Sequence, residues 1–369
     1  MTKTSRGSPK NAHGSCRRPG GSRLSVGWGI ISTGRHPDVK VAPAMKLAAD
    51  TRIAAVYSRD IGRAKAFADK HDIVGAYDSL DTLLGDPDVD AVFISSPNSL
   101  HAEHTIAAAQ AGKHMLVEKP MAVSVQQATD MVRAARDNNV KLGVGFHLRF
   151  HLGHVKAREL MEHGVVGVPS MIQGQWCLGQ RGAVQPPART GLSAWWGDPA
   201  MIGGASTLMG TGVHVIDLLQ YLTGHSIVEV SALTDGQTPE RPLEQAAAIA
   251  LRFDDGTLGS ITVGRRMPDT ENDAMIYGSD GRIALRGTVW ETQTGNLDVT
   301  SETVELAESY PEEPLELYRL QIEAFNRAVA GEREFHASGE DGLSVVRVTS
   351  AIIESASTGR AVKIERTEA

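Results

Sequence analysis

A lysine and a histidine that lie far apart in the chain have side chains suited to proton transfer. Lys119 stands in the tripeptide Glu118-Lys119-Pro120, directly after a short apolar run, and His214 lies in a second polar cluster. A lysine exchanges a proton with a substrate hydroxyl when its pKa falls from about 10.4 toward neutrality. Desolvation and a nearby positive charge would both lower that pKa. A solvated Glu-Lys pair and a structural histidine are the alternatives.

The surroundings of His214 contain further candidates for a substrate pocket. His214 and Asp217 are spaced to share one face of a helix. The pair Gly203-Gly204 before that helix would let a ligand approach closely. We expect Trp196 and Arg149 to shape the pocket together with His214, with a core position for Trp196 as the alternative.

A glycine-containing turn, Gly29-Ile30-Ile31-Ser32-Thr33-Gly34, ends the first apolar run of the chain. Glycine in such a turn lets backbone amides approach a pyrophosphate, and the N-terminus of the following helix favours the anion. We therefore expect this turn to hold a dinucleotide, at Gly29, Ser32, Thr33 and Gly34. Ser32 stands where the familiar pattern has a further glycine. A glycine turn between any strand and helix is the alternative.

The end of the second apolar run bears on the choice of cofactor. An acid at this strand end would bind the ribose 2′-hydroxyl and select NAD, but here the acid comes late, at Asp60. Ser58-Arg59 occupies the place of a 2′-phosphate, and arginine pairs well with phosphate. We therefore expect NADP rather than NAD. The alternative is that Arg59 stacks on the adenine and either cofactor binds.

Polar residues also follow two later runs, where the carboxyl ends of parallel strands would form a ligand crevice. Ser96, Pro97 and Asn98 follow one run, with His101 just beyond, and Glu118-Lys119 follows the next. We expect all of them to lie against the cofactor. Asn98 as the cap of a helix that starts at Ser99 is a compatible alternative.

Strands and helices alternate in the first part of the chain. Short apolar runs, typical of strands covered on both faces, occur at Val26–Ile31, Ile53–Tyr57, Ala91–Ser95, Met115–Val117 and Lys141–Val144. Helical periods lie between them, and Ser124 with Gln127 has the spacing of a capping box. This alternation predicts a doubly wound parallel sheet, a Rossmann NAD(P)-binding domain, over residues 24–147.

The remainder of the chain, residues 148–369, has the pattern of an α+β domain. Alternating residues at 171–176 indicate a half-exposed strand. Two Asp-Gly pairs, at 255–256 and 280–281, separate apolar runs and predict hairpins with type I′ turns. Helices are expected at about Thr207–Leu222, Leu315–Ala330 and Leu343–Ser357. We therefore expect an antiparallel sheet flanked by helices over these residues.

Length and composition limit the possible classes of function. The 369 residues, 41% of them hydrophobic, suffice for two domains with their own cores. The net charge of −7 gives no sign of a nucleic-acid-binding face. Two distant cysteines, Cys16 and Cys177, provide neither a disulfide framework nor metal-ligand spacing, so we expect free thiols and no metal.

The first 23 residues are basic and rich in Gly, Ser and Pro, which predicts a disordered tail. The Arg17-Arg18 pair lacks the apolar stretch that an export signal would need. No run of about 18 apolar residues occurs, so no membrane span is expected. We therefore expect a cytoplasmic protein that does not bind membranes.

The combined motifs resemble those of the Gfo/Idh/MocA oxidoreductase family from about Val26 to Ile364. The resemblance rests on the glycine turn, on Ser96-Pro97-Asn98 with His101, on Glu118-Lys119-Pro120, on Arg149-Phe150, and on Trp196 through Asp217. The resemblance implies that the partner of the Rossmann domain is an open antiparallel sheet used for substrate binding and oligomer contacts. It also implies that Lys119 is the catalytic lysine and that His214 binds substrate or acts as an acid or base. One departure is clear: the family often has Asp four residues before the histidine, and this chain has Gly210. Asp198, His147 or Asp217 are candidates to replace it.

The expected reaction is hydride transfer between a nicotinamide ring and a hydroxyl- or keto-bearing carbon of a sugar, cyclitol or glycoside. The protein supplies position and proton handling for this chemistry. Two rivals remain at this point: a lyase or hydrolase that uses the bound cofactor as a transient oxidant, and a non-catalytic dinucleotide-binding protein. A homodimer or homotetramer is expected, because a broad exposed sheet face favours self-association.

Overall fold

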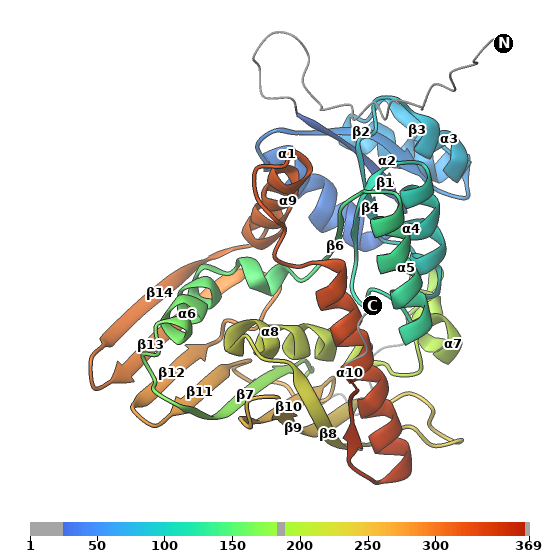
Figure 1. The fold of residues 1–369 in the computed structure, drawn as a ribbon. Coiled ribbons are helices and arrows are strands. Elements are labelled where there is room, and N and C mark those ends of the chain that lie inside the picture. The colour runs from blue at the N-terminus through green and yellow to red at the C-terminus, as the bar shows by residue number, and fades with distance from the viewer. Residues whose placement is uncertain (1–24, 183–188, 366–369) are drawn as a thin grey trace, which may run out of the picture.

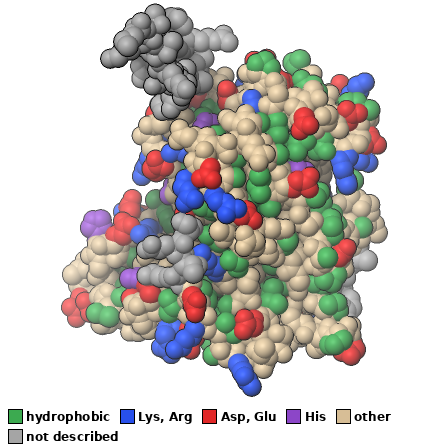
Figure 2. Space-filling view, turned by 45° about the vertical axis from the view of Figure 1, so that its right-hand side comes forward, with side chains coloured by type: hydrophobic (Ala, Val, Ile, Leu, Met, Phe, Trp, Pro, Cys, Tyr) green, Lys and Arg blue, Asp and Glu red, His purple; other side chains and the backbone are tan. Residues whose placement is uncertain are grey.

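The computed structural model describes residues 25–182 and 189–365, so the predicted tail at 1–23 and Cys16 lie outside the described residues. Two sheets, one in each part of the chain, organise the fold (Figure 1). On the face seen in Figure 2, acidic and basic side chains are interspersed over both parts. None of the described helices is long and apolar enough to cross a bilayer.

The first sheet is parallel and has six strands in the order β3-β2-β1-β4-β5-β6. The strands are β1 (Val26–Ile31), β2 (Thr51–Tyr57), β3 (Gly75–Tyr77), β4 (Ala91–Ile94), β5 (His114–Val117) and β6 (Leu142–Val144). The five predicted strands are confirmed within two residues at each end. Strand β3 was not predicted, because three residues are too short for a periodic pattern. The order reverses between β1 and β4, and this switch point opens a crevice at the carboxyl ends.

Helices cover both faces of this sheet. They are the π-helical turn η1 (Pro37–Val41) leading into α1 (Ala42–Leu47), then α2 (Ile61–His71), α3 (Leu80–Gly85), α4 (His101–Gln110) and α5 (Val125–Asp137). Helix α5 begins at Ser124, whose side chain accepts a hydrogen bond from the Gln127 amide at 3.2 Å. The Gln127 side chain accepts from the Val123 amide instead of from Ser124. Half of the predicted capping box is therefore present.

The second sheet has nine strands in the order β14-β13-β12-β11-β7-β10-β9-β8-β15. The strands are β7 (Pro169–Cys177), β8 (Ile227–Thr234), β9 (Ala246–Phe253), β10 (Leu258–Gly264), β11 (Ala274–Gly278), β12 (Gly281–Arg286), β13 (Gln293–Ser301), β14 (Glu305–Glu313) and β15 (Val362–Lys363). It is antiparallel except for the β7–β10 pair, which is parallel. The chain leaves the sheet after β7 and returns as β8 only after several helices, so β7 has no hairpin partner.

The two predicted hairpins, β9–β10 and β11–β12, are confirmed, but their predicted turn type is wrong. A type I′ turn needs positive φ at both central residues. Gly256 has a φ of 94°, whereas Asp255, Asp280 and Gly281 do not have positive φ. In the first hairpin the Gly256 amide donates to the Phe253 carbonyl, so the loop is longer than the two residues that a type I′ turn requires.

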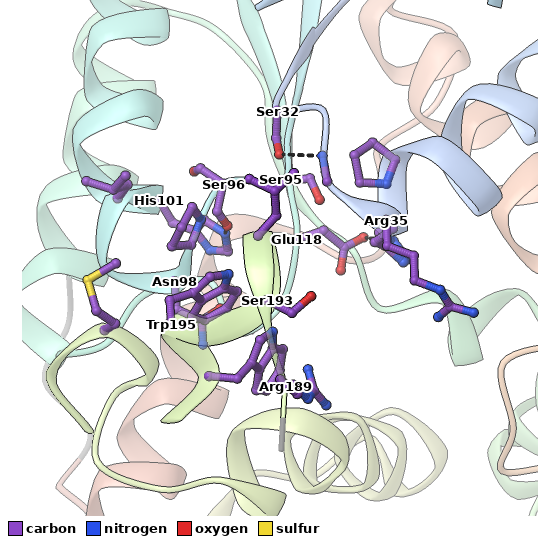
Figure 3. A pocket seen from close by; sticks show the side chains of 18 of the residues that line it. Ser32, Arg35, Ser95, Ser96, Asn98, His101, Glu118, Arg189, Ser193 and Trp195 are labelled. Atoms are coloured by element: carbon purple, nitrogen blue, oxygen red, sulfur yellow. Dashed lines mark hydrogen bonds and ion pairs between the residues drawn. The ribbon is translucent and has the colours of Figure 1, made fainter. Parts of the chain in front are cut away.

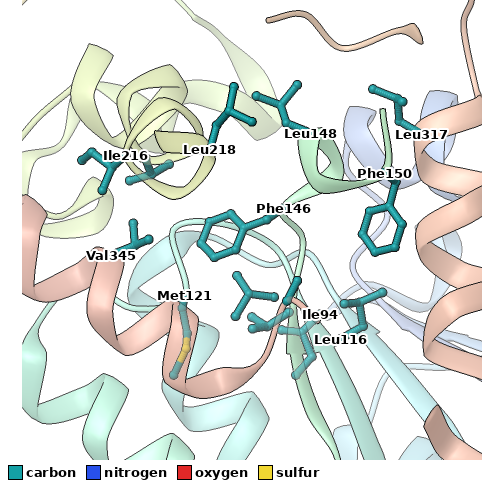
Figure 4. Close-up of a cluster of buried hydrophobic side chains, with 14 of the residues drawn as sticks. Ile94, Leu116, Met121, Phe146, Leu148, Phe150, Ile216, Leu218, Leu317 and Val345 are labelled. Carbon is teal, nitrogen blue, oxygen red and sulfur yellow. The ribbon is translucent and has the colours of Figure 1, made fainter. Parts of the chain in front are cut away.

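Helices of the second part of the chain pack against elements of both domains. They are α6 (Leu152–Glu162), α7 (Pro199–Ile202), the π-helical turn η5 (Leu208–Gly212) continuing into α8 (Val213–Thr223), α9 (Glu316–Val329) and α10 (Gly339–Thr358), with 3₁₀ turns η3 (His147–Phe150) and η4 (Gly191–Gly197). Helix α8 packs on β7, α10 packs on both β8 and α5, and α9 packs on α1. Figure 4 shows the shared core, where side chains of the first sheet meet those of α8 and α10.

Candidate active site

A cavity of about 660 Å³ lies at the carboxyl ends of β1, β2, β4 and β5, and the segment 189–211 closes its other side (Figure 3). Most residues singled out in the sequence line it, namely Ser32, Thr33, Gly34, Ser58, Arg59, Ser96, Pro97, Asn98, His101, Glu118, Lys119 and Trp196. Gly29, Arg149 and His214 do not belong to the lining. The parallel sheet therefore gathers polar residues from four separate turns, because its strand ends share one edge.

The glycine turn after β1 places only its second part against the cavity. Ser32 adopts a φ of 127°, a conformation that favours glycine, and its hydroxyl accepts a hydrogen bond from the Gly34 amide at 3.1 Å. Gly29 lies inside β1, where an added Cβ would come within about 3.0–3.3 Å of three side chains beneath the sheet. Gly29 therefore serves close packing, and its place inside the strand differs from the predicted contact with a dinucleotide.

At the end of β2, arginine side chains line the cavity, whereas Asp60 does not. Ser58 and Arg59 line the cavity, as does Arg63 from the first turn of α2. Asp60 caps α2 by accepting a hydrogen bond from the Arg63 amide at 2.9 Å, and it pairs with the Arg63 guanidinium at 3.7 Å. Asp60 is not part of the cavity lining, because the cap directs its carboxylate to the helix.

Asn98 and His101 form hydrogen bonds between different segments that line the cavity. The Asn98 amide donates to the Ile202 carbonyl at 3.0 Å and caps no helix, so the capping alternative is wrong. The two ring nitrogens of His101 lie 2.8 Å from the carbonyl oxygens of Pro120 and Ser96. His101 thus joins the turn after β4 to the turn after β5, where the Lys119-Pro120 bond is cis.

Lys119 is half-buried at the centre of the cavity. Its ammonium donates to the carbonyl oxygen of Gly210 at 3.3 Å, on the facing segment. Burial lowers the pKa of Lys119 below its usual 10.5, while the carboxylates of Glu118 and Glu291 oppose the shift. The side chain is therefore positioned between the strand ends and the start of α8, with a pKa moved toward the range useful for proton exchange.

Glu118 is buried beside Lys119 and stays ionised. Its carboxylate lies 2.9 Å from the Nε2 atom of His36, at the start of the helix that follows the glycine turn. Burial by itself favours the neutral acid, but His36 and Lys119 hold the pKa of Glu118 at about 2. Glu118 is thus a fixed negative charge next to the Lys119 ammonium.

His214 stands four residues after Gly210, at the start of α8, and its ring lies in a buried aromatic cluster. Its ring centroid is 4.5 Å from that of His147 and 5.0 Å from that of Trp176, and His147 stacks on Tyr318 at 5.0 Å. The Nδ1 atom of His214 has no hydrogen-bond partner among the described residues. Burial first, then the Lys119 charge, lower the pKa of His214 well below 6.5, so this imidazole is neutral.

His214 and Asp217 share one face of α8, as their helical spacing predicted. This face packs against η3. Asp217 accepts hydrogen bonds from the Arg149 guanidinium at 2.6–3.1 Å, and Arg149 also pairs with Asp341 at 3.1 Å and bonds the His336 carbonyl. Arg149 is buried and outside the cavity, so the structure differs from the prediction that it shapes the substrate pocket. Its position joins η3, α8 and α10.

Two other features before α8 also have structural explanations. Gly203 and Gly204 have φ of 101° and 81°, and Gly203 ends α7 in the left-handed conformation. A Cβ at Gly203 would lie 2.8 Å from Met209, so close packing accounts for this glycine better than ligand approach. Asp198 caps α7 by accepting from the Ala200 amide at 2.9 Å, so it does not replace the missing acid at Gly210.

Four functional candidates were missed in the sequence: His36, Glu291, Arg189 and Arg265, all lining the cavity. Glu291 lies 3.5 Å from the Lys40 ammonium and acts electrostatically on Lys119, so it supplies a carboxylate near the lysine. It stands in a loop before β13, where no periodicity or motif marks it. The Arg189 guanidinium lies over the Trp196 ring, 4.1 Å from its centroid. Trp196 is half-buried: it lines the cavity and also packs against the hydrophobic core, so both expected positions apply in part.

Comparisons with known proteins agree with this architecture. The family model described as an oxidoreductase family with an NAD-binding Rossmann fold matches residues 26–146, and the GFO/IDH/MocA C-terminal domain matches residues 154–284. The chain is 30% identical over 338 residues to D-xylose 1-dehydrogenase (NADP(+)) 2 of Haloferax volcanii, which covers 92% of this chain and 99% of that protein. It is 29% identical over 339 residues to 1,5-anhydro-D-fructose reductase of Ensifer adhaerens, covering 92% and 98%.

Among solved structures, an aldose-aldose oxidoreductase of Caulobacter crescentus, complexed with glycerol, has a TM-score of 0.80 at 25% identity. The match covers 92% of this chain and 100% of that chain. The likeness therefore extends over both sheets and over the helices between them.

Proposed function

Because the chain belongs to the Gfo/Idh/MocA family of NAD(P)-binding oxidoreductases, we propose that it transfers a hydride between a nicotinamide and a hydroxyl- or keto-bearing carbon of a sugar or polyol. The observation that carries the proposal is the position of Lys119. Its amine stands in the cavity between the strand ends and the start of α8, and burial lowers its pKa. Relatives named as sugar dehydrogenases and reductases support the substrate class.

The residues of the crevice fit a dinucleotide. The turn Ser32–Gly34 and the first residues of the helix that follows it line the cavity, and a helix N-terminus suits a pyrophosphate. Arg59 lines the same cavity, and no carboxylate among the described residues pairs with it. When bound, the nicotinamide supplies the hydride acceptor or donor.

The proton of the reacting hydroxyl is assigned to Lys119. In the oxidative direction the O–H proton passes to the free amine as the carbinol hydrogen leaves with its electron pair and C=O forms. Glu118 keeps a negative charge beside the ammonium that results, and the Gly210 carbonyl orients it. His214 is outside the cavity lining and four residues after Gly210 in the chain, and we assign it a role in positioning the start of α8.

A spectrophotometric screen tests this function against the transient-oxidation rival. Aldoses, polyols and cyclitols are incubated with NADP⁺ or NAD⁺, and absorbance at 340 nm is followed. Steady formation of the reduced cofactor with at least one substrate is expected. Substrate consumption with no net change in reduced cofactor would contradict the proposal and favour a lyase or hydrolase that returns the hydride.

We further propose that the enzyme prefers NADP. Arg59 and Arg63 line the cavity at the end of β2, whereas Asp60 is turned to the helix that it caps. Replacing Arg59 by Gln should raise the Kd for NADPH about 10- to 100-fold and change that for NADH little, because hydrogen bonds to a charged phosphate are lost only with NADPH. Fluorescence titration with both reduced cofactors measures this. Equal losses for both would refute the preference.

A further inference from the structure

Two arginines on the substrate side of the cavity stand without a carboxylate partner. Arg189 precedes η4, and Arg265 follows β10, so they come from different elements yet line one cavity with Lys119. Neither forms an ion pair with any described acid. The neighbouring arginines behave differently: Arg266 pairs with Asp235, and Arg181 pairs with Asp269 at 2.6 Å.

The guanidinium of Arg189 contacts an aromatic ring, that of Trp196, and forms no ion pair with a described acid. Arg189 lies over the indole of Trp196 at 4.1 Å, and Trp196 in turn stacks on Trp195 at 4.8 Å. Cation–π attraction holds a guanidinium over an indole face without using its N–H donors. Figure 3 shows Arg189 across the cavity from Ser32, on the side away from the glycine turn.

The two arginines share the cavity, and the pKa of each guanidinium is lowered there. Partial burial, and then the Arg265 charge, lower the pKa of Arg189 to about 10, and partial burial lowers that of Arg265. Arg189 and Lys119 line the same cavity, so one bound substrate can contact both side chains. Guanidinium groups that line a cavity without a counter-ion are candidates to bind an anion during function.

We propose that Arg189 and Arg265 form an oxyanion-binding subsite, and that the natural substrate is an anionic sugar, carrying a carboxylate or a phosphate, rather than a neutral one. The inference rests on the proposed hydride transfer at Lys119 and defines its substrate class. A planar guanidinium binds either oxyanion through two parallel hydrogen bonds. The anion would neutralise the pair while the reacting carbon faces Lys119.

Matched sugars that share a reacting end but differ in charge test the proposal. D-glucose, D-glucuronate and D-glucose 6-phosphate form one set, and the corresponding D-galactose compounds form another. The value of kcat/KM is measured at 340 nm with NADP⁺ and NAD⁺. We expect one anionic member to exceed its neutral counterpart at least about 10-fold, since hydrogen bonds to charged groups are worth that much. The two anionic arms distinguish carboxylate from phosphate.

Variants connect that preference to the two side chains. Arg189→Gln and Arg265→Gln should each lower the anionic-to-neutral ratio of kcat/KM by about 10- to 100-fold. Arg181→Gln is the matched control, because Arg181 is an exposed arginine of the same region that lies outside the cavity. Its ratio should equal that of the unaltered enzyme. Thermal unfolding and NADPH binding of each variant verify that the fold is kept.

A direct binding measurement separates failure of this inference from failure of the proposed function. Calorimetric titration of D-glucuronate and D-glucose 6-phosphate into the NADPH-bound enzyme follows binding without turnover. Binding that depends on Arg189 and Arg265, with no hydride transfer, would keep the subsite and refute the dehydrogenase assignment. Turnover of neutral sugars with equal or higher kcat/KM, or a ratio unchanged in the double variant, would overturn the subsite and leave the dehydrogenase assignment intact.

Discussion

Replacing Lys119 by Met removes the amine that stands at the end of β5 in the cavity lining. Its only hydrogen bond to the described residues, to the Gly210 carbonyl, is 3.3 Å long, so the fold loses little. General acid–base catalysis by a positioned side chain contributes about 10²- to 10⁴-fold. The variant should therefore lose that factor in kcat, about 3–5 kcal/mol of transition-state stabilisation, while its Kd for NADPH stays within a few-fold.

The proton-transfer role of Lys119 also predicts the direction in which kcat/KM changes with pH. Oxidation needs the free amine, so kcat/KM should rise with pH through the pKa of Lys119 and level off above it. Burial lowers that pKa from 10.5, so the rising limb should lie below pH 10.5. Glu118 opposes the shift, so Glu118→Gln should move the limb to lower pH. In the reductive direction the ammonium is needed, and the rate should fall through the same pKa.

Lys113→Met is the matched control for the loss of a half-buried lysine. The Lys113 ammonium donates to the carbonyl oxygens of Asp86 and Val89, and burial also lowers its pKa, but it lies outside the cavity. This variant should keep kcat and the position of the pH limb. Stopped-flow and steady-state assays at 340 nm from pH 6 to about 10.5 measure both. A Lys119→Met enzyme with near-normal kcat and an unchanged limb would refute the assigned proton transfer.

Three further predictions concern stability and reactivity. Arg149→Met should lower the free energy of unfolding, measured with urea, by about 3–5 kcal/mol, because the buried Asp217 carboxylate loses its partner. A decrease of less than about 1 kcal/mol would contradict this. Ser32→Gly should be more stable than Ser32→Ala by about 1 kcal/mol, since both lose the hydroxyl and only glycine accepts a φ of 127° freely; the reverse order would argue against strain. Burial raises the pKa of the Cys177 thiol to about 11, so in a Cys16→Ser background iodoacetamide at pH 8 should label only unfolded protein, as mass spectrometry would reveal.

Local patterns in the chain were enough to predict the first sheet and the sheet edge at which the cavity lies. Buried parallel strands need continuous apolar runs, so β1 and β4 stand out in the sequence. Residues directly after such runs must meet at one edge, which is why Ser58, Ser96 and Lys119 could be placed together before any coordinates. The two Asp-Gly pairs likewise predicted the hairpins, though not their turn type, because the turn depends on loop length and φ.

The tertiary structure alone decided which charged groups are paired. Arg149 and Asp217 are 68 positions apart in the chain. Because η3 packs on α8, Arg149, which was predicted to line the pocket, forms a buried ion pair with Asp217 instead. Arg189 and Arg265 come from separate elements, and nothing in either neighbourhood indicates that they share a cavity. Periodicity reports which face of an element is apolar, but the partner of a charge depends on distances across the chain that local sequence does not encode.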